Sequence, residues 1–191
     1  MSKIIFLNGC ASAGKTTLAK AIQYCSEEPY LFVGIDALFS ALPKKLVGFS
    51  EKNEKEGFRY VVNPETGVLT EMRVSPYAGK IFSCLPKVVK LLADNGLNII
   101  FDECNFHYEL VENYKIFFSN HKFFSIGVKC DLETMEEREK LRGNRVIGMA
   151  KIFHQSAKNF RYPYDLIVDT ANNSPFTNAK KVLNFVEGSF S

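Results

Sequence analysis

Short apolar runs, each rich in β-branched and aromatic residues, recur at five places along the chain. Such runs are typical of parallel strands that are covered on both faces. The predicted strands are residues 3–8, 31–35, 98–101, 124–128 and 166–168. Between them, apolar residues recur at helical spacing. The predicted helices are residues 16–25, about 77–94, 108–119, 132–140 with a continuation after Gly143, and about 177–186. This alternation predicts an α/β fold, a three-layer sandwich with a five-stranded parallel sheet and helices on both faces.

Residues 44–77 fit this alternation least well. Within them, residues 58–62 and 68–70 flank the turn-forming sequence Asn63-Pro64-Glu65-Thr66-Gly67 and predict a small β-hairpin. Ligands of open α/β sheets bind at the carboxyl ends of the strands, where insertions tend to contact them. The insert at about 44–77 is therefore either a determinant of substrate specificity or a surface hairpin without substrate contact.

Composition agrees with one globular domain over residues 1–191, because 46% of the residues are hydrophobic and 24% are charged. No apolar run is long enough to span a membrane, and the first predicted strand leaves no room for a signal peptide. The cysteines lack C-x-x-C spacing, and the three histidines lack metal-ligand spacing. We therefore expect a cytoplasmic protein with free thiols. A net charge of +3 does not by itself indicate a nucleic-acid partner.

The chemistry begins in the segment from Gly9 to Thr16, which has the pattern G-x-x-x-x-G-K-[ST] between a predicted strand and a predicted helix. Such a loop points backbone N–H groups at a phosphate, and the following helix adds its N-terminal dipole. We expect Lys15 to contact the β- and γ-phosphates of ATP and the Thr16 hydroxyl to bind Mg²⁺. The predicted nucleotide-binding residues are Gly9, Cys10, Ala11, Ser12, Ala13, Gly14, Lys15, Thr16 and Thr17. A preference for ATP over GTP is not determined by this pattern.

Cys10 lies inside this predicted phosphate site. A helix N-terminus lowers the pKa of a nearby thiol, so alkylation of Cys10 is expected to block nucleotide binding. The alternative is an inert small residue that fills space in the loop.

Acidic residues follow the predicted strands at the edge of the sheet that faces ligands. Asp36 is the candidate general base for an acceptor hydroxyl, or else a cap of a helix beginning at Ala37. Asp102 is a candidate ligand of Mg²⁺ or its waters, together with Thr16, or else a buried hydrogen-bond acceptor. Asp169 is expected to be structural. Asp36 and Asn105 are the candidate acceptor-binding residues, and Phe39, Phe49 and Phe58 are candidates for an apolar acceptor pocket.

Residues 138–161 are strongly basic, with Glu139 as the only acid. A basic segment after the fourth strand is suited to a lid, at about 132–150, that closes over the triphosphate. Arg138, Arg142 and Arg145 follow helical spacing and are candidate catalytic residues, although Gly143-Asn144 interrupts the helix. The alternative is a solvated basic face.

Taken together, several motifs resemble the chloramphenicol phosphotransferase family of P-loop kinases. They are Gly9-x-x-Ser12-Ala13-Gly14-Lys15, residues 33–36, 99–102 and 126–131, Arg138-Glu139, residues 142–150 and residues 164–170. The resemblance implies a P-loop kinase-like fold and ATP-dependent phosphorylation of a small-molecule hydroxyl. It also implies that Asp36 accepts the proton and that the lid lies around residues 138–145. Because residues 44–77 match poorly, the acceptor stays open between chloramphenicol, another antibiotic and an endogenous metabolite.

Other functional classes fit less well. A GTPase needs an Asn-Lys-x-Asp motif, and a dinucleotide-binding dehydrogenase needs G-x-G-x-x-G, where Ala11 occupies the middle position. A polynucleotide or nucleoside kinase stays open, but the insert is not basic enough to favour a nucleic acid. A catalytically silent nucleotide-binding protein also stays open, although it would not need Asp36. The oligomeric state is not determined by the sequence.

Overall fold

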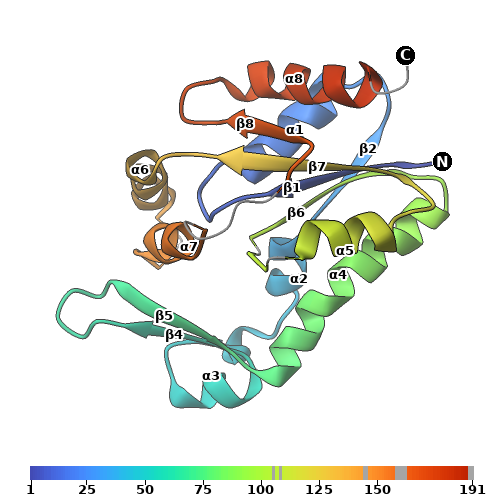
Figure 1. The fold of residues 1–191 in the computed structure, drawn as a ribbon. Coiled ribbons are helices and arrows are strands. Elements are labelled where there is room, and N and C mark those ends of the chain that lie inside the picture. Colours follow the sequence, from blue (N-terminus) through green and yellow to red (C-terminus); the bar gives the residue numbers. More distant parts are fainter. Residues whose placement is uncertain (105, 108, 144–145, 158–162, 189–191) are drawn as a thin grey trace.

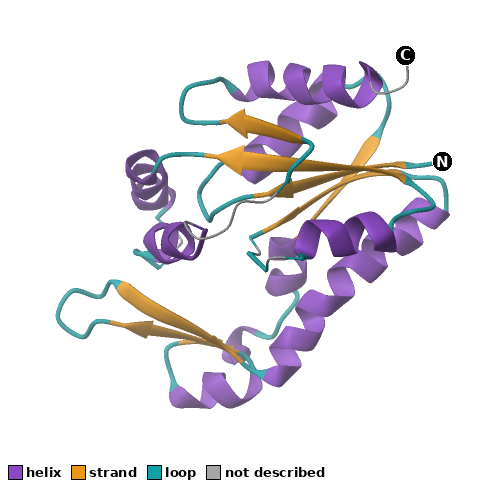
Figure 2. Cartoon of the chain, viewed as in Figure 1, coloured by secondary structure: helices purple, strands orange, loops and turns teal. Residues whose placement is uncertain are grey.

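The computed structural model describes residues 1–104, 106–107, 109–143, 146–157 and 163–188 (Figures 1 and 2). Its centre is a five-stranded parallel sheet with the strand order β2–β6–β1–β7–β8. The strands are β1 (Lys3–Asn8), β2 (Tyr30–Gly34), β6 (Asn98–Glu103), β7 (Lys122–Lys129) and β8 (Leu166–Asp169). The prediction of a five-stranded parallel sheet is confirmed.

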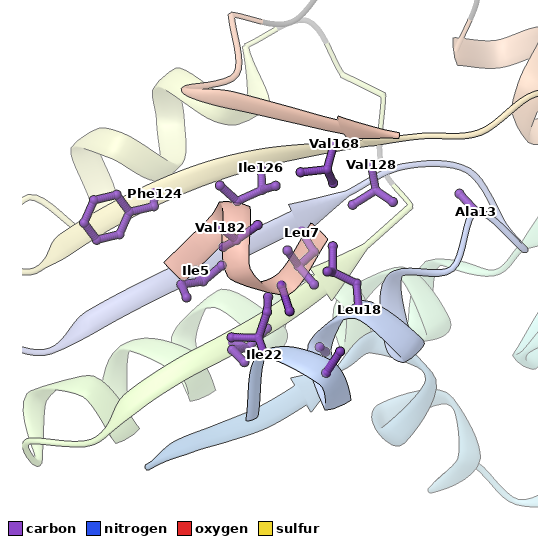
Figure 3. Close-up of a cluster of buried hydrophobic side chains, with 14 of the residues drawn as sticks. Ile5, Leu7, Ala13, Leu18, Ile22, Phe124, Ile126, Val128, Val168 and Val182 are labelled. Carbon is purple, nitrogen blue, oxygen red and sulfur yellow. The ribbon is translucent and has the colours of Figure 1, made fainter. Parts of the chain in front are cut away.

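Each face of the sheet is covered by two helices. Side chains alternate along β1, so that Ile5 and Leu7 lie on one face while Ile4 and Phe6 lie on the other. The first face packs on α1 (Lys15–Cys25) and α8 (Pro175–Gly188), as Figure 3 shows. The second face packs on α4 (Pro76–Asp94) and α5 (Leu110–Phe117). The three-layer sandwich is therefore confirmed, and no helix of the described residues is long and apolar enough to cross a membrane.

Between β2 and α4 the chain leaves the central sheet and builds a small substructure (Figure 1). Its elements are α2 (Ile35–Ser40), a 3-10 turn η1 (Lys44–Leu46), β3 (Val47–Gly48), α3 (Glu51–Glu56), β4 (Phe58–Val62) and β5 (Leu69–Val74). The predicted hairpin is present as β4 and β5, and β3 pairs with β4 in parallel to form a three-stranded sheet. The sequence did not indicate β3, which has only two residues, or α3, which is short and polar. We call residues 44–74 the insert.

Two helices follow β7 in the region predicted as a lid. They are α6 (Leu132–Arg142) and α7 (Met149–Ala157). Gly143, with φ +63°, ends α6 in the left-handed conformation that closes many helices. The helix predicted to run from Leu132 and to continue after Gly143 is thus two separate helices. Of the three arginines predicted for the lid, Arg138 and Arg142 lie in α6.

Candidate functional site

The loop from Gly9 to Gly14 connects β1 to α1 and has the geometry of a phosphate cradle. Ser12 has φ +63°, the one positive value among the described non-glycine residues, and Gly14 has φ +88°. Gly9 has no room for a side chain, because a Cβ would collide with the carbonyl oxygen of Val128. Lys15 Nζ donates to the carbonyl oxygens of Gly9 and Cys10, both at 2.9 Å. A buried ammonium therefore already lies at the loop.

Asp102 and Asp36 follow neighbouring strands at the same edge of the sheet. Asp102 is buried near the end of β6, opposite Gly34 of β2. Asp36 is the second residue of α2, which begins at Ile35 and has Gly34 as its N-cap without a side-chain bond. Asp36 thus lies within the helix, and the alternative that it caps a helix beginning at Ala37 is wrong.

Both acids line a cavity of about 940 Å³ that also contains the phosphate loop. The loop contributes Ser12, Lys15 and Thr16 to its wall. The opposite wall comes from α2 and the insert, with residues Phe39, Val47, Phe58, Tyr60 and Met72. The rings of Phe39 and Phe58 pack at 4.6 Å between centroids. We call this space the acceptor cavity. Of the three phenylalanines expected to line such a pocket, Phe49 lies outside it and is 57% exposed.

The floor of the acceptor cavity holds a buried pair that sequence reasoning missed. Tyr114 of α5 donates its hydroxyl proton to Oε1 of Glu103 at 2.7 Å. Burial, and then the Glu103 carboxylate, raise the pKa of Tyr114 above its usual value. Glu103 directly follows Asp102 at the strand end, and that adjacency was a usable signal. No comparable signal marked Tyr114, because its spacing along the helix is that of a core residue.

A second cavity of about 630 Å³ opens on the other side of the phosphate loop. It is lined by Gly14 and Thr17, by Arg138 and Arg142 of α6, and by the loop 170–175. Arg138 Nη2 donates to the carbonyl oxygen of Thr170 at 2.6 Å, and the Thr170 hydroxyl donates to Ala13 O at 2.6 Å. We call it the lateral cavity. Arg142 lines both cavities, whereas Arg138 lines the lateral cavity alone.

Asp169 fixes the loop that borders the lateral cavity. Its Oδ1 accepts from the backbone N–H groups of Ala171 and Asn172 at 2.9 and 3.2 Å. Hydrogen bonds, first of all from the Asn172 side chain, lower the pKa of the Asp169 carboxyl. These contacts agree with the structural role expected for Asp169.

Two predicted site residues, Arg145 and Asn105, lie outside the residues that the structure describes. The expectation that the pKa of the Cys10 thiol is lowered is wrong. Burial raises the pKa of the Cys10 thiol, although Lys15 acts in the opposite direction. Desolvation outweighs the Lys15 charge here, because the Cys10 side chain packs into the core beneath the loop.

Within the described residues, no cluster of three or more His, Cys, Asp or Glu side chains could by itself hold a metal ion. A Mg²⁺ that accompanies a nucleotide needs fewer protein ligands, because phosphates and water complete its coordination. The Thr16 hydroxyl and the Asp102 carboxylate line the same cavity and offer oxygen ligands of the required kind. The residues present fit such an ion.

Comparison with known proteins agrees with this geometry. The sequence profile of the chloramphenicol phosphotransferase-like proteins matches residues 2–187. The chain belongs to this family. Two Mycobacterium tuberculosis relatives, whose names propose an O-phosphotransferase activity, are each 30% identical over 176 residues, which cover 88% of this chain and 75% of theirs.

Several solved kinases have a similar fold. The APS kinase of Mycobacterium tuberculosis, solved with AMPPNP and APS, has a TM-score of 0.62 at 16% identity, covering 97% of this chain and 98% of that one. A gluconokinase from Sinorhizobium meliloti has a TM-score of 0.61 at 11% identity, with coverages of 98% and 93%. Shikimate kinase from Acinetobacter baumannii has a TM-score of 0.58 at 14% identity, with coverages of 99% and 95%. At these identities the likeness establishes the fold. Family and fold together make the chain an enzyme of the kinase type.

Proposed function

We propose that this protein transfers the γ-phosphoryl group of ATP to a hydroxyl of a small molecule held in the acceptor cavity. The observation that carries the proposal is that Asp36 and the phosphate-loop residues Lys15 and Thr16 line one cavity, whose far wall is the insert. A carboxylate, a phosphate site and space for a second substrate thus meet in one place, as in-line transfer requires.

In this proposal the acceptor hydroxyl lies between Asp36 and the γ-phosphate. Asp36 accepts the hydroxyl proton while the hydroxyl oxygen bonds to the γ-phosphorus and the bond to the bridging oxygen of ADP breaks. Lys15 leaves the carbonyl groups of Gly9 and Cys10 to bind the phosphates. Thr16 and Asp102 would hold Mg²⁺, which supplies positive charge against the phosphate oxygens when bound.

The lateral cavity is the proposed site of the nucleoside part of ATP. It adjoins Gly14 and Thr17 at the start of α1, and Arg138 closes it against the loop 170–175. Arg142 lines the lateral and acceptor cavities alike, which supports a role for it as a donor to the phosphoryl group in transit. Arg145, the third arginine of the predicted lid, keeps its proposed role as a sequence-based hypothesis.

The walls of the acceptor cavity indicate the kind of acceptor. Phe39 and Tyr60 present ring surfaces in front of the buried ring of Phe58, so a hydroxylated molecule with an apolar ring fits better than a small sugar. Within this class of hydroxylated ring compounds, the acceptor stays open between chloramphenicol, another antibiotic and an endogenous metabolite. A polynucleotide or nucleoside kinase and a silent nucleotide-binding protein are the competing functions.

A transfer screen with γ-³²P-labelled ATP tests the proposal. The acceptors are amphenicols, aminocyclitols, nucleosides and RNA 5′ ends, and the control is the Lys15→Met variant. Label on a small non-nucleoside alcohol, absent with the variant, supports the proposal. Label on nucleosides or RNA ends favours the competing kinases, and no transfer despite ATP binding favours a silent protein.

A further inference from the structure

A buried carboxylate joins the two helices of the lid region. Glu139 of α6 is 1% exposed, and its two oxygens accept from the backbone N–H groups of Gly148 and Ala150 at 2.8 and 2.9 Å. Gly148 directly precedes α7 and Ala150 lies in its first turn, where N–H groups lack partners within the helix. A carboxylate also interacts favourably with the positive end of the helix dipole. The start of α7 is therefore fixed to α6.

The chain just before α7 is also hydrogen-bonded to the insert. The backbone N–H of Leu69, the first residue of β5, donates to the carbonyl oxygen of Ile147 at 2.7 Å. Gly148 directly follows Ile147 in the chain and has φ +102°. A Cβ on Gly148 would lie 2.8 Å from Val68 Cγ1 and 3.0 Å from the Leu69 carbonyl oxygen. Only glycine permits this close approach, because backbone atoms form part of the obstacle. Figure 1 shows α7 next to the β4–β5 hairpin.

These contacts form a continuous connection between the two cavities. At one end, Arg138 and Arg142 of α6 line the lateral cavity, and Glu139 of the same helix holds the start of α7. At the other end, β5 and its partner β4 carry Met72, Phe58 and Tyr60, which line the acceptor cavity. A nucleotide that orders α6 would thereby also order the acceptor wall.

We propose that Glu139 and Gly148 are positioning residues that couple nucleotide binding to the acceptor wall through the Ile147–Leu69 hydrogen bond. The inference rests on the proposed function, because it takes a nucleotide as the ligand beside α6. Neither residue lines either cavity, so each acts through the segments it holds. ATP then prepares the insert to receive the acceptor.

Amide hydrogen exchange with and without AMPPNP and Mg²⁺ tests the coupling, and it needs no acceptor. In the unaltered protein the nucleotide is expected to slow exchange in the phosphate loop and also at the Leu69 amide. The Leu69 effect is expected to be about 5- to 150-fold, the usual range of coupling between sites. In Gly148→Ala, the phosphate loop keeps its protection while the Leu69 response disappears.

Two glycine variants serve as matched controls. Gly143 and Gly67 also have positive φ, at +63° and +67°, but a Cβ on either meets nothing within 4 Å. Gly143→Ala and Gly67→Ala therefore place an alanine at a positive φ without blocking the contact, and both are expected to keep the Leu69 response.

Glu139→Gln is the second test if Gly148→Ala does not fold. An amide offers one acceptor oxygen to the two N–H donors, so the Leu69 response should again disappear. The inference is overturned if the Leu69 response persists in either folded variant. It is also overturned if, in the unaltered protein, the nucleotide protects the phosphate loop but not the Leu69 amide. A phosphate loop that AMPPNP does not protect overturns the proposed function, and the inference with it.

Discussion

Gly34 and Asp102 face each other across β2 and β6, and a Cβ on Gly34 would lie 2.6 Å from Oδ1 of Asp102. The missing side chain leaves room for a buried carboxylate at the edge of the sheet where Asp36 also lies. The sequence Gly34-Ile35-Asp36 thus serves both acids, since its glycine accommodates Asp102 and its third residue is the candidate base.

Gly34→Ala should displace the Asp102 carboxylate, because the buried site leaves the added methyl group no other space. If Asp102 helps hold Mg²⁺, the Mg²⁺ concentration for half-maximal transfer should rise about 10- to 100-fold, the scale of disturbed ligand orientation. Gly79→Ala in α4 is the control, because a Cβ there meets nothing within 4 Å. An unchanged Mg²⁺ titration in folded Gly34→Ala would remove Asp102 from the metal site.

Lys15→Met should abolish detectable phosphoryl transfer, because the charge that holds the β- and γ-phosphates is lost. Transfer and ATP binding are measured on protein whose circular dichroism matches that of the unaltered chain. Lys20→Met, at an exposed position of the same helix, should keep full activity. Normal turnover in Lys15→Met would show that the loop is not the phosphate site.

Asp36→Asn should lower kcat by about 10²- to 10⁴-fold while leaving ATP affinity nearly intact, because an amide cannot accept the hydroxyl proton. Steady-state kinetics with both substrates varied measure this effect. A collapse of ATP affinity instead would assign Asp36 to metal binding or to the architecture of the site.

Arg138 and Arg142 should differ in the kinetic constant that they control. Arg142→Ala should lower kcat by at least about 10²-fold, since a donor to the transferring group stabilises the transition state most. Arg138→Ala should instead raise the KM for ATP, because Arg138 lines only the lateral cavity. Near-normal constants for both variants would mean that the basic stretch is a solvated face.

Alkylating reagents should modify Cys10 more slowly than the exposed thiol of Cys84. Burial raises the pKa of Cys10, so the fraction of Cys10 present as thiolate at pH 8 is lower than for an ordinary thiol. Because the thiolate is the reactive form, alkylation of Cys10 should be slow and should become faster as the pH rises. Exposed Cys84 should react first. Peptide mass spectrometry after timed iodoacetamide treatment measures both rates. Faster labelling of Cys10 than of Cys84 would contradict the burial of its thiol.

Local patterns predicted much of the framework. The apolar runs located all five strands of the central sheet to within a few residues, because strands covered on both faces need nearly continuous hydrophobic sequence. Polar elements were missed for the same reason. The helix α3 has the sequence Glu51-Lys52-Asn53-Glu54-Lys55-Glu56, whose only buried residue is Asn53, so it carries no hydrophobic period.

The sequence by itself determined the strand–loop–helix turn from Gly9 to Thr16, because Gly9 and Gly14 act through local backbone geometry. It also located Asp36 and Asp102 at strand ends. Tertiary structure alone decided everything that depends on packing between distant segments. It placed Arg142 at both cavities and Arg138 at the lateral cavity alone. It also buried the Cys10 thiol, which raises its pKa, and joined Ile147 to Leu69. Burial and approach between remote segments depend on the whole fold, and no spacing along the chain encodes them.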